Sequence, residues 1–271
     1  MPSWIRCIRG VMLDISGVLK NGDVAISGSV EAVKRLRDAG LTVRFVTNET
    51  QLTRRMLLEK LLNIGFQLTE NEIFSPAPVM VNLLNEKTLR PMLLVHPKVL
   101  PEFIGIDQSS PNCVVIGDAV DFFTYERLND AFKLLMTQKG APLFTLGRGR
   151  YYKEEDGLCM DVGGFTAALE YASGVQAEVV GKPAKTFFAT ALNDMGLDVS
   201  EVLMVGDDIV SDVGGAQKFG LKGVLVRTGK FIPEKDENHP IVKPDAIVDD
   251  LAQGVDMILS GQAEEKISGN I

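Results

Sequence analysis

Short apolar runs of strand length alternate with helically spaced apolar positions in the first part of the chain. Residues 10–13 form the first apolar run, and residues 41–46 form a second that is rich in β-branched and aromatic side chains. Between these runs, Val30, Val33 and Leu36 recur at a helical spacing among charged residues. Another helical pattern follows the second run. The order strand, helix, strand, helix predicts a parallel sheet.

A proline-rich segment at residues 75–78 then interrupts the pattern and suggests a domain hinge. Beyond it, an amphipathic helix is predicted over residues 125–138, with Leu128, Phe132 and Leu135 on one face. New strands are predicted at residues 91–95, 113–117 and 142–146. This middle block has the elements of a small α/β domain of its own.

The pattern of the first block resumes near residue 177, with apolar strand candidates inside residues 177–183 and 202–208. We therefore predict an α/β protein with a Rossmann-like parallel-sheet core and an inserted α/β domain. The core is assigned to residues 1–84 and 177–271, and the inserted domain is assigned to residues 85–176.

Charge and composition limit the class of partner. A net charge of -8 argues against nucleic acid or an anionic membrane surface, because a phosphate backbone attracts a basic face. No apolar run approaches the roughly 18 residues of a membrane span, and the first residues lack the apolar region of a secretory signal. The cysteines are odd in number and widely spaced, which is typical of reduced thiols. We therefore expect a protein of the cytoplasm or the nucleus.

Asp14 directly follows the first apolar run and precedes small residues. In an open α/β sheet, ligands bind at the carboxyl ends of the strands, and an aspartate there can attack phosphorus to form an aspartyl phosphate. A lone aspartate at this position is also typical of a helix N-cap. The other strand ends decide between these two interpretations.

Three aspartates, Asp207, Asp208 and Asp212, follow a later apolar run. Carboxylates that lie close together repel one another unless a cation neutralises them. Mg²⁺ is the natural candidate, because it prefers oxygen ligands and shares them with phosphate oxygens and waters. An isolated Asp-Asp pair fits a solvated turn equally well, but Asp14 at another strand end favours the metal site.

Two further strand ends carry groups suited to phosphate. Lys182 can offset charge on a phosphate and on an aspartate nucleophile, although a lone lysine is usually a surface residue. Thr47 and Asn48 can donate hydrogen bonds to phosphoryl oxygens, although by themselves they are typical of an N-cap. The set of nucleophile, hydroxyl, lysine and acidic cluster, in this order, is more specific than any of its members.

In order and residue type, these segments resemble the haloacid dehalogenase superfamily of phosphohydrolases. The resemblance extends over nearly the whole chain, and the insertion between the hydroxyl and the lysine resembles the large (C2-type) cap of that superfamily. It rests on residues 14–19 (Asp-Ile-Ser-Gly-Val-Leu), 46–48 (Val-Thr-Asn), 181–183 (Gly-Lys-Pro) and 206–216 (Gly-Asp-Asp-Ile-Val-Ser-Asp-Val-Gly-Gly-Ala). Residues 149–154 and 227–231 resemble, more narrowly, members that act on pyrophosphate, phosphohistidine and phospholysine.

The resemblance implies a metal site and a nucleophile. Asp14 would be the nucleophile and a Mg²⁺ ligand, and Ser16 would offer its backbone carbonyl to the metal. Asp207 would be the main further ligand, while Asp208 and Asp212 would hold metal-bound waters or orient the lysine of the set.

The same resemblance implies a substrate site and an assembly. Thr47, Asn48, Glu49 and Lys182 would contact the phosphoryl group of the substrate. The resemblance also implies a homodimer that forms through the cap.

One departure from the family pattern concerns the leaving group. Most phosphatases of the superfamily have a second aspartate two residues after the nucleophile, and that position is Ser16 here. A hydroxyl is a poor acid near neutral pH, so a general-acid contribution of about 10² to 10⁴ is in doubt. The loss of this acid should slow the hydrolysis of pyrophosphate and of labile P–N bonds least. It should slow the hydrolysis of phosphate monoesters with alkoxide leaving groups most.

We therefore predict a Mg²⁺-dependent phosphohydrolase that acts through Asp14 on pyrophosphate, P–N phospho-compounds and phosphorylated His or Lys side chains. A basic loop at residues 147–156, with Arg148, Arg150 and Lys153, is either a contribution to substrate choice or a solvated hairpin. The alternative function is a catalytically weak phosphate-binding or regulatory module of the same fold, which turnover would exclude. Dinucleotide binding is disfavoured because no Gly-x-Gly-x-x-Gly follows the first strand.

Overall fold

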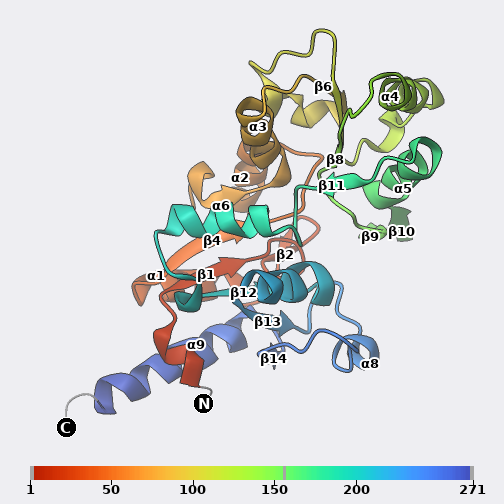
Figure 1. Cartoon of the computed structure of the whole chain (residues 1–271). Helices are drawn as coiled ribbons and strands as arrows, with labels where there is room; N and C mark the ends of the chain where they lie inside the picture. Colours follow the sequence, from red (N-terminus) through yellow and green to blue (C-terminus); the bar gives the residue numbers. More distant parts are fainter. Residues whose placement is uncertain (1–2, 155–156, 269–271) are drawn as a thin grey trace. The chain divides into compact units, whose positions relative to one another are not determined.

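The computed structural model describes residues 3–154 and 157–268. The chain divides into two compact units, each with its own parallel sheet (Figure 1). The first unit comprises Met1–Thr47, Leu58–Phe74 and Lys185–Ile271, and the second comprises Asn48–Leu57 and Ser75–Ala184. These limits follow compactness alone. The division into a catalytic core of residues 1–84 and 177–271 and a cap of residues 85–176 stays a prediction.

The first unit contains a six-stranded parallel sheet with the strand order β14-β13-β12-β1-β4-β5. Its strands are β1 (Gly10–Leu13), β4 (Thr42–Val46), β5 (Ile73–Phe74), β12 (Val202–Gly206), β13 (Lys222–Val226) and β14 (Ala246–Val248). Every residue of β1 and β12 is buried, as expected for central strands that are covered on both faces. The predicted Rossmann-like parallel sheet is confirmed.

Helices and short connections surround this sheet. The longer helices are α1 (Ser29–Asp38), α6 (Lys185–Met195) and α9 (Leu251–Ser268), together with α2 (Arg54–Asn63), which spans the limit between the units. The shorter elements are η1 (Ser3–Cys7), β2 (Lys20–Asn21), β3 (Val24–Ala25), η2 (Glu70–Glu72), η5 (Val199–Glu201), η6 (Ile209–Gly214), α7 (Gly215–Phe219) and α8 (Pro233–Asp236). In α1, the helically spaced residues Val33 and Leu36 are buried, as their spacing predicts.

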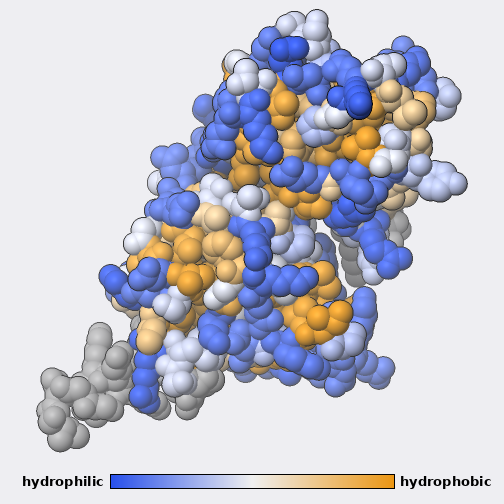
Figure 2. Space-filling model, in the orientation of Figure 1, coloured by the Kyte–Doolittle hydropathy of each residue, from blue (hydrophilic) through white to orange (hydrophobic). Residues whose placement is uncertain are grey.

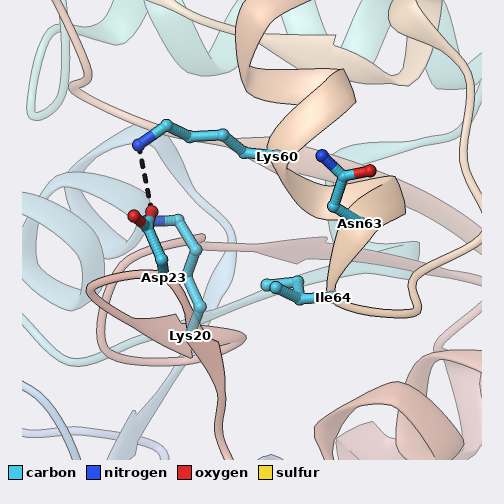
Figure 3. Close-up of a pocket in the computed structure, with 5 residues that line it drawn as sticks. All are labelled: Lys20, Asp23, Lys60, Asn63 and Ile64. Carbon is cyan, nitrogen blue, oxygen red and sulfur yellow. Dashed lines mark hydrogen bonds and ion pairs between the residues drawn. The ribbon is translucent and has the colours of Figure 1, made fainter.

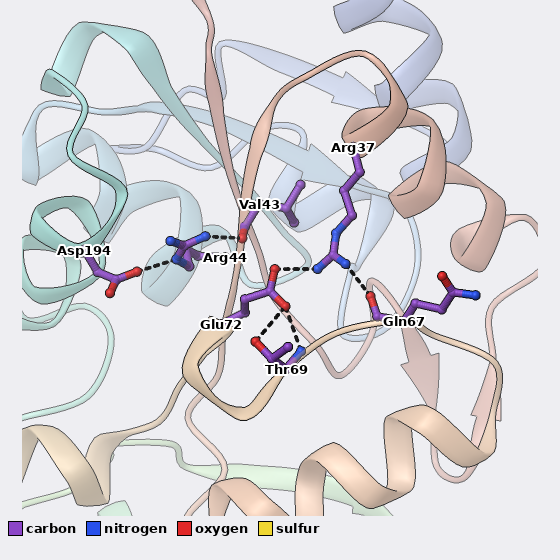
Figure 4. Close-up of polar contacts among 7 residues, drawn as sticks. All are labelled: Arg37, Val43, Arg44, Gln67, Thr69, Glu72 and Asp194. Atoms are coloured by element: carbon purple, nitrogen blue, oxygen red, sulfur yellow. Dashed lines mark hydrogen bonds and ion pairs between the residues drawn. The ribbon is translucent and has the colours of Figure 1, made fainter.

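Polar contacts fix the connections of the first unit around β4 and β5. Arg37 of α1 donates to the Gln67 carbonyl at 2.5 Å and to Glu72 at 2.6 Å (Figure 4). Glu72 also accepts the Thr69 backbone N–H at 2.7 Å, which closes a capping box. Because Glu72 directly precedes β5, these bonds tie that edge strand to α1.

The second unit contains a four-stranded parallel sheet with the strand order β11-β8-β7-β6. Its elements are α3 (Pro76–Glu86), β6 (Pro91–Leu94), η3 (Pro97–Phe103), β7 (Cys113–Ile116), η4 (Val120–Phe122), α4 (Tyr125–Thr137), β8 (Leu143–Thr145), β9 (Tyr151–Glu154), β10 (Gly157–Met160), α5 (Val162–Ser173) and β11 (Ala177–Val179). Strands β9 and β10 pair as an antiparallel hairpin. The predicted α/β character of the inserted block is confirmed.

The proline-rich segment at residues 75–78 is not an open linker. Pro76 begins α3, and Ser75 occupies the N-cap position in an extended conformation. Proline is accepted in a first helical turn because the N–H groups there have no partner within the helix. A change of compact unit nevertheless occurs between Phe74 and Ser75.

The surface mixes polar and apolar residues. Figure 2 shows hydrophilic and hydrophobic residues interspersed on the visible face. Ile104, Tyr125, Tyr171 and Ile241 are each 80% or more exposed, as single apolar residues on a globular surface often are. Among the helices that the structure describes, none combines the length and the apolar character that crossing a bilayer requires.

Candidate active site

The carboxyl ends of β1 and β12 bring the first predicted site residues together. The two strands are parallel neighbours, with Leu13 opposite Val205. Asp14 follows β1, and its backbone N–H donates to the Val205 carbonyl at 3.0 Å. Asp207 follows β12 directly. Because parallel neighbours end at the same edge of a sheet, both carboxylates emerge at that edge.

Asp14, Asp207 and Asp212 form a buried carboxylate cluster, in which one oxygen from each side chain lies within 4.8 Å of the others. Their exposed fractions are only 7%, 2% and 1%. One carboxylate oxygen, Asp207 Oδ1, is buried and has no hydrogen-bond partner in the part of the chain that the structure describes. An unpaired buried carboxylate oxygen is costly, so this arrangement calls for a cation.

The pKa of Asp207 is also affected by its burial beside other carboxylates. Burial, followed by the charges of Asp14 and Asp212, raises the pKa of Asp207 well above its ordinary value. The backbone N–H of Lys230 donates to Asp207 Oδ2 at 2.7 Å and partly opposes that rise. A divalent cation among the three carboxylates would remove the repulsion that burial leaves in place, so the residues present fit a hard cation with oxygen ligands.

Asp208 and Ser16 have other surroundings. Asp208 Oδ1 accepts the backbone N–H groups of Val210 and Ser211 at 3.0 and 2.9 Å, which caps the helical segment η6. Asp208 is not a member of the carboxylate cluster, although its own N–H donates to Asp212 Oδ2 at 3.1 Å. Ser16 is exposed and forms an isolated bridge with Lys20. The predicted metal contacts of Asp208 and Ser16 stay predictions.

A loop after β13 completes the edge of the first unit, and the sequence assigned no role to it. Gly17 and Gly229 both have positive φ, +88° and +61°, and a Cβ at either would overlap Asp207 Oδ2. The Thr228 hydroxyl donates to the Gly17 carbonyl. The turn after Ser16 and this loop are therefore held against each other, with the Asp207 carboxylate between them.

Lys230 brings the cation of this loop to the acidic edge. Its Nζ lies 3.8 Å from Asp208 Oδ2, and its side chain is 55% exposed. Burial lowers the pKa of Lys230, but the nearby carboxylates, with Asp208 foremost, raise the pKa above its usual value. The sequence signal for this loop was that residues 227–231 are among the segments of the narrower family resemblance, which assigned no role to Lys230.

The second unit holds three of the predicted phosphate-binding residues. Asn48 clamps Lys182, because Asn48 Nδ2 donates to the Lys182 carbonyl at 2.9 Å and Asn48 Oδ1 accepts the Lys182 N–H at 2.8 Å. Lys182 is only 2% exposed. Glu49 accepts the Gln51 backbone N–H at 2.6 Å, so one of its oxygens serves a local turn. Their predicted contacts with a phosphoryl group stay predictions.

Thr47 is the predicted phosphate-binding residue of the first unit. It follows β4 directly, it is only 3% exposed, and its backbone N–H donates to the Phe74 carbonyl at 2.9 Å. Its predicted contact with the substrate also stays a prediction.

The basic loop at residues 147–156 contains strand β9 (Tyr151–Glu154), which pairs with β10. Residues 155–156 lie outside the described residues, as does the side chain of Lys153. Arg148 donates to both oxygens of Glu170 at 2.8 and 2.6 Å. Because this bidentate pair compensates the Arg148 charge, Arg148 serves the packing of the second unit.

The first unit has a cavity of about 230 Å³ that no residue of the carboxylate cluster lines. It is lined by Lys20, Asp23, Lys60, Asn63 and Ile64 (Figure 3). Lys60 pairs with Asp23 at 3.0 Å and lowers the pKa of that carboxyl. None of its lining residues belongs to the predicted site. We therefore assign the candidate site from the side chains at the strand ends and not from the size of a cavity.

Comparison with known proteins matches two segments of the chain to two hydrolase families. Residues 11–105 match a family described as haloacid dehalogenase-like hydrolase, and residues 179–254 match one described as HAD-hydrolase-like. Phospholysine phosphohistidine inorganic pyrophosphate phosphatase of Danio rerio is 56% identical over 96% of this chain and 97% of its own length. The Homo sapiens protein of that name is 52% identical, over 93% and 94%. Haloacid dehalogenase-like hydrolase domain-containing protein 2 of Bos taurus is 48% identical, over 87% and 90%.

Solved structures share the fold. A 4-nitrophenylphosphatase of Thermotoga maritima superposes with a TM-score of 0.87 and is 26% identical, with 94% of this chain and 99% of that chain covered. A p-nitrophenyl phosphatase of Archaeoglobus fulgidus gives a TM-score of 0.86 at 27% identity, with 92% and 99% covered.

Proposed function

The chain belongs to the haloacid dehalogenase-like hydrolases and is an enzyme of the phosphatase type, and from this premise we propose a Mg²⁺-dependent phosphohydrolase that works through an aspartyl phosphate on Asp14. Its proposed substrates are pyrophosphate and compounds with P–N bonds, including phosphorylated His and Lys side chains. The names of the relatives that are 52 to 56% identical support this choice of substrates.

One observation carries the proposal: Asp14 and Asp207 at adjacent strand ends are buried together with Asp212 of η6, and one oxygen of Asp207 has no partner among the described residues. A protein that used Asp207 only for packing would pair this oxygen. Asp14, Asp207 and Asp212 would hold the metal, and Ser16 and Asp208 are its further predicted ligands. Bound Mg²⁺ would supply positive charge that offsets the charge developing on the phosphoryl oxygens.

The protein's own residues supply the nucleophile and its position. The Asp14 backbone N–H bond to Val205 fixes the start of the turn, so the carboxylate is held at the strand end. Attack by an Asp14 oxygen on phosphorus forms the aspartyl phosphate and releases the leaving group, and water then hydrolyses the acyl phosphate. Ser16 offers no acid of suitable strength, which favours substrates whose leaving group needs less help from a proton donor of the protein.

The remaining predictions concern binding, assembly and location. Thr47, Asn48, Glu49 and Lys182 are proposed to bind the phosphoryl group, and substitution of each should raise KM. A homodimer through the inserted domain is proposed from the family resemblance, and sedimentation equilibrium would check it. We also propose that the enzyme acts in the cytoplasm or the nucleus.

A panel of phosphorylated compounds tests the proposal directly. Phosphate release is measured from pyrophosphate, phosphoramidate, imidodiphosphate, p-nitrophenyl phosphate and an alkyl phosphomonoester, with Mg²⁺ and with a chelator. We expect turnover of the P–O–P and P–N compounds to exceed that of the alkyl ester and to vanish with the chelator. Activity that persists without metal, or a preference for the alkyl ester, would contradict it.

The variant Ser16→Asp tests the argument about the leaving group. The new carboxyl can act as the missing acid, so activity on the alkyl phosphomonoester should rise at least about tenfold relative to activity on pyrophosphate. Ser16→Asn is the control, because its side chain is similar in size and has no acidic proton. An unchanged ratio in Ser16→Asp would remove the explanation.

A further inference from the structure

We propose that the Lys230 ammonium binds the second phosphoryl group of a diphosphate substrate and stabilises it as the leaving group. This inference rests on the proposed function and names the residue that selects its substrate class. It makes Lys230 a specificity-determining residue at the place where the sequence lacks an acid.

The placement of Lys230 is built into the first unit. Its backbone N–H is fixed to Asp207 Oδ2 at 2.7 Å, so the loop position is set by a member of the carboxylate cluster. The Thr228 hydroxyl is bonded to the Gly17 carbonyl. Gly17 is the residue after Ser16, so the loop is anchored to the turn that carries the position of the missing acid.

The side chain of Lys230 retains the capacity to bind an anion. An ammonium has three donors, and the described contact of Nζ is an ion pair of 3.8 Å with Asp208 Oδ2. That distance exceeds a hydrogen bond, and the side chain is 55% exposed. A phosphoryl oxygen can therefore replace or share this contact.

The chemical step explains why a cation at this place matters. Attack of an Asp14 carboxylate oxygen on one phosphorus breaks the bond from that phosphorus to the bridging atom. When the bridging atom is oxygen, the bonding electron pair goes to that oxygen, and orthophosphate departs with one more negative charge. In imidodiphosphate the pair goes to the bridging nitrogen, which takes a proton from water as phosphoramidate departs. Lys230 keeps its proton and donates a hydrogen bond to the departing phosphate. Charge stabilisation thus takes the place of proton donation.

Two pairs of substrates isolate this effect. Imidodiphosphate and phosphoramidate share a scissile P–N bond, and only imidodiphosphate carries a second phosphoryl group. Pyrophosphate and p-nitrophenyl phosphate form the corresponding P–O pair. In Lys230→Gln, kcat/KM for imidodiphosphate and pyrophosphate should fall about 10- to 100-fold, the size expected for a lost charge-assisted hydrogen bond. Phosphoramidate and p-nitrophenyl phosphate should change less than about threefold.

Matched variants and a binding measurement complete the test. Lys230→Arg keeps the charge and should restore most of the diphosphate activity. Lys235→Gln removes an exposed lysine from α8 nearby and should change neither substrate of a pair. Methylenediphosphonate, which has an inert P–C–P bridge, should inhibit p-nitrophenyl phosphate turnover about tenfold less well in Lys230→Gln than in the wild type. All rates are taken at Mg²⁺ concentrations that saturate each variant.

The outcomes separate this inference from the proposed function. Equal losses on both members of a pair would overturn it, because Lys230 would then act on the carboxylates or the fold. Unchanged kinetics and unchanged inhibition would also overturn it. If the wild type did not hydrolyse pyrophosphate at all, the proposed function would fail, and the inhibition constant of methylenediphosphonate would still decide whether Lys230 binds a second phosphoryl group.

Discussion

Asp207 in the first unit and Glu170 in the second are both buried carboxylates, and their surroundings shift the two pKa values in opposite directions. Glu170 accepts two hydrogen bonds from Arg148, at 2.8 and 2.6 Å, and one from the Ala177 N–H at 2.9 Å. Its pKa is lowered, chiefly by the Arg148 bond. Asp207 instead lies beside Asp14 and Asp212, and burial and these charges raise its pKa.

A second buried carboxylate of the second unit also has hydrogen-bond donors. Asp118 is only 5% exposed, and it accepts a bond from Gln51 at 2.8 Å and one from the Val120 N–H at 3.3 Å. Burial alone therefore does not distinguish a site from a structural group in this molecule. The distinguishing property is a buried carboxylate oxygen without a hydrogen-bond partner among the described residues, and Asp207 at the end of β12 carries it.

Neutralising a member of the cluster should separate activity from stability. In Asp14→Asn the nucleophile is lost, so phosphate release should fall at least about 10³-fold. Stability without metal should hold or rise, because one repelling charge is removed from a buried group. Phosphate release and the thermal midpoint in a chelator measure the two effects. Residual activity above a tenth of wild type, or a collapsed fold, would contradict the comparison.

Metal should stabilise the first unit chiefly through the carboxylate cluster. At a free Mg²⁺ concentration about 100 times the dissociation constant, the free energy of unfolding of the wild type should rise by about 2.7 kcal/mol. Asp207→Asn should lose most of this gain, because it removes a proposed ligand, whereas Glu170→Gln should keep it. Thermal unfolding with and without Mg²⁺ measures the difference. A metal-induced shift of equal size in Asp207→Asn would place the ion elsewhere.

The strand-end aspartates were predictable because their position follows from periodicity. An apolar run of strand length fixes where a strand ends, and parallel neighbours end at one edge, so Asp14 and Asp207 were expected to meet. Asp208 shows where this reasoning stops. Its carboxylate caps the segment after β12, and whether an aspartate caps a helix or faces a ligand depends on the turn geometry.

The Lys230 loop was hidden for a related reason. Its approach to Asp207 depends on two positive-φ glycines, Gly17 and Gly229, which are far apart in the sequence and close in space. No periodicity encodes such a contact. The amide clamp of Asn48 on Lys182 is equally non-local, so the sequence predicted both residues and not the bonds between them.

Removing the charge of Glu170 should affect stability and spare activity. Glu170→Gln loses a charge-assisted pair, and because Arg148 is partly exposed and can be solvated, the expected cost is about 1 to 3 kcal/mol. A carboxyl with a lowered folded pKa contributes stability above its ordinary pKa of 4.5, and loses it as the pH falls through the folded pKa. The difference in unfolding free energy between wild type and variant should therefore be constant above about pH 6 and shrink below pH 4.5.

The cluster should show the opposite dependence in metal-free protein. The folded pKa of Asp207 is raised, so its protonated form contributes stability below the ordinary value of 3.8, and the contribution is lost as the pH rises through the folded pKa. The stability of Asp207→Asn relative to the wild type should accordingly increase as the pH rises. Thermal midpoints across pH 4 to 9 in a chelator check this. A difference that is independent of pH would show that Asp207 is compensated after all.

The smallest expected effect comes from a carboxylate close to Glu170 in the same unit. Glu178 follows Ala177, whose N–H binds Glu170, and it pairs with Lys87 at 3.8 Å with both side chains about half exposed. Exposed pairs of this kind contribute little, so Glu178→Gln should cost at most about 0.5 kcal/mol. The variant leaves the Lys87 ammonium over the Phe144 ring, at 5.6 Å, undisturbed. Urea unfolding of the two glutamine variants side by side makes the comparison. If Glu178→Gln lowered the free energy of unfolding as much as Glu170→Gln, the removed charge alone would explain both losses. The buried pair of Glu170 would then have no special contribution to stability, and the comparison with Asp207 would fail.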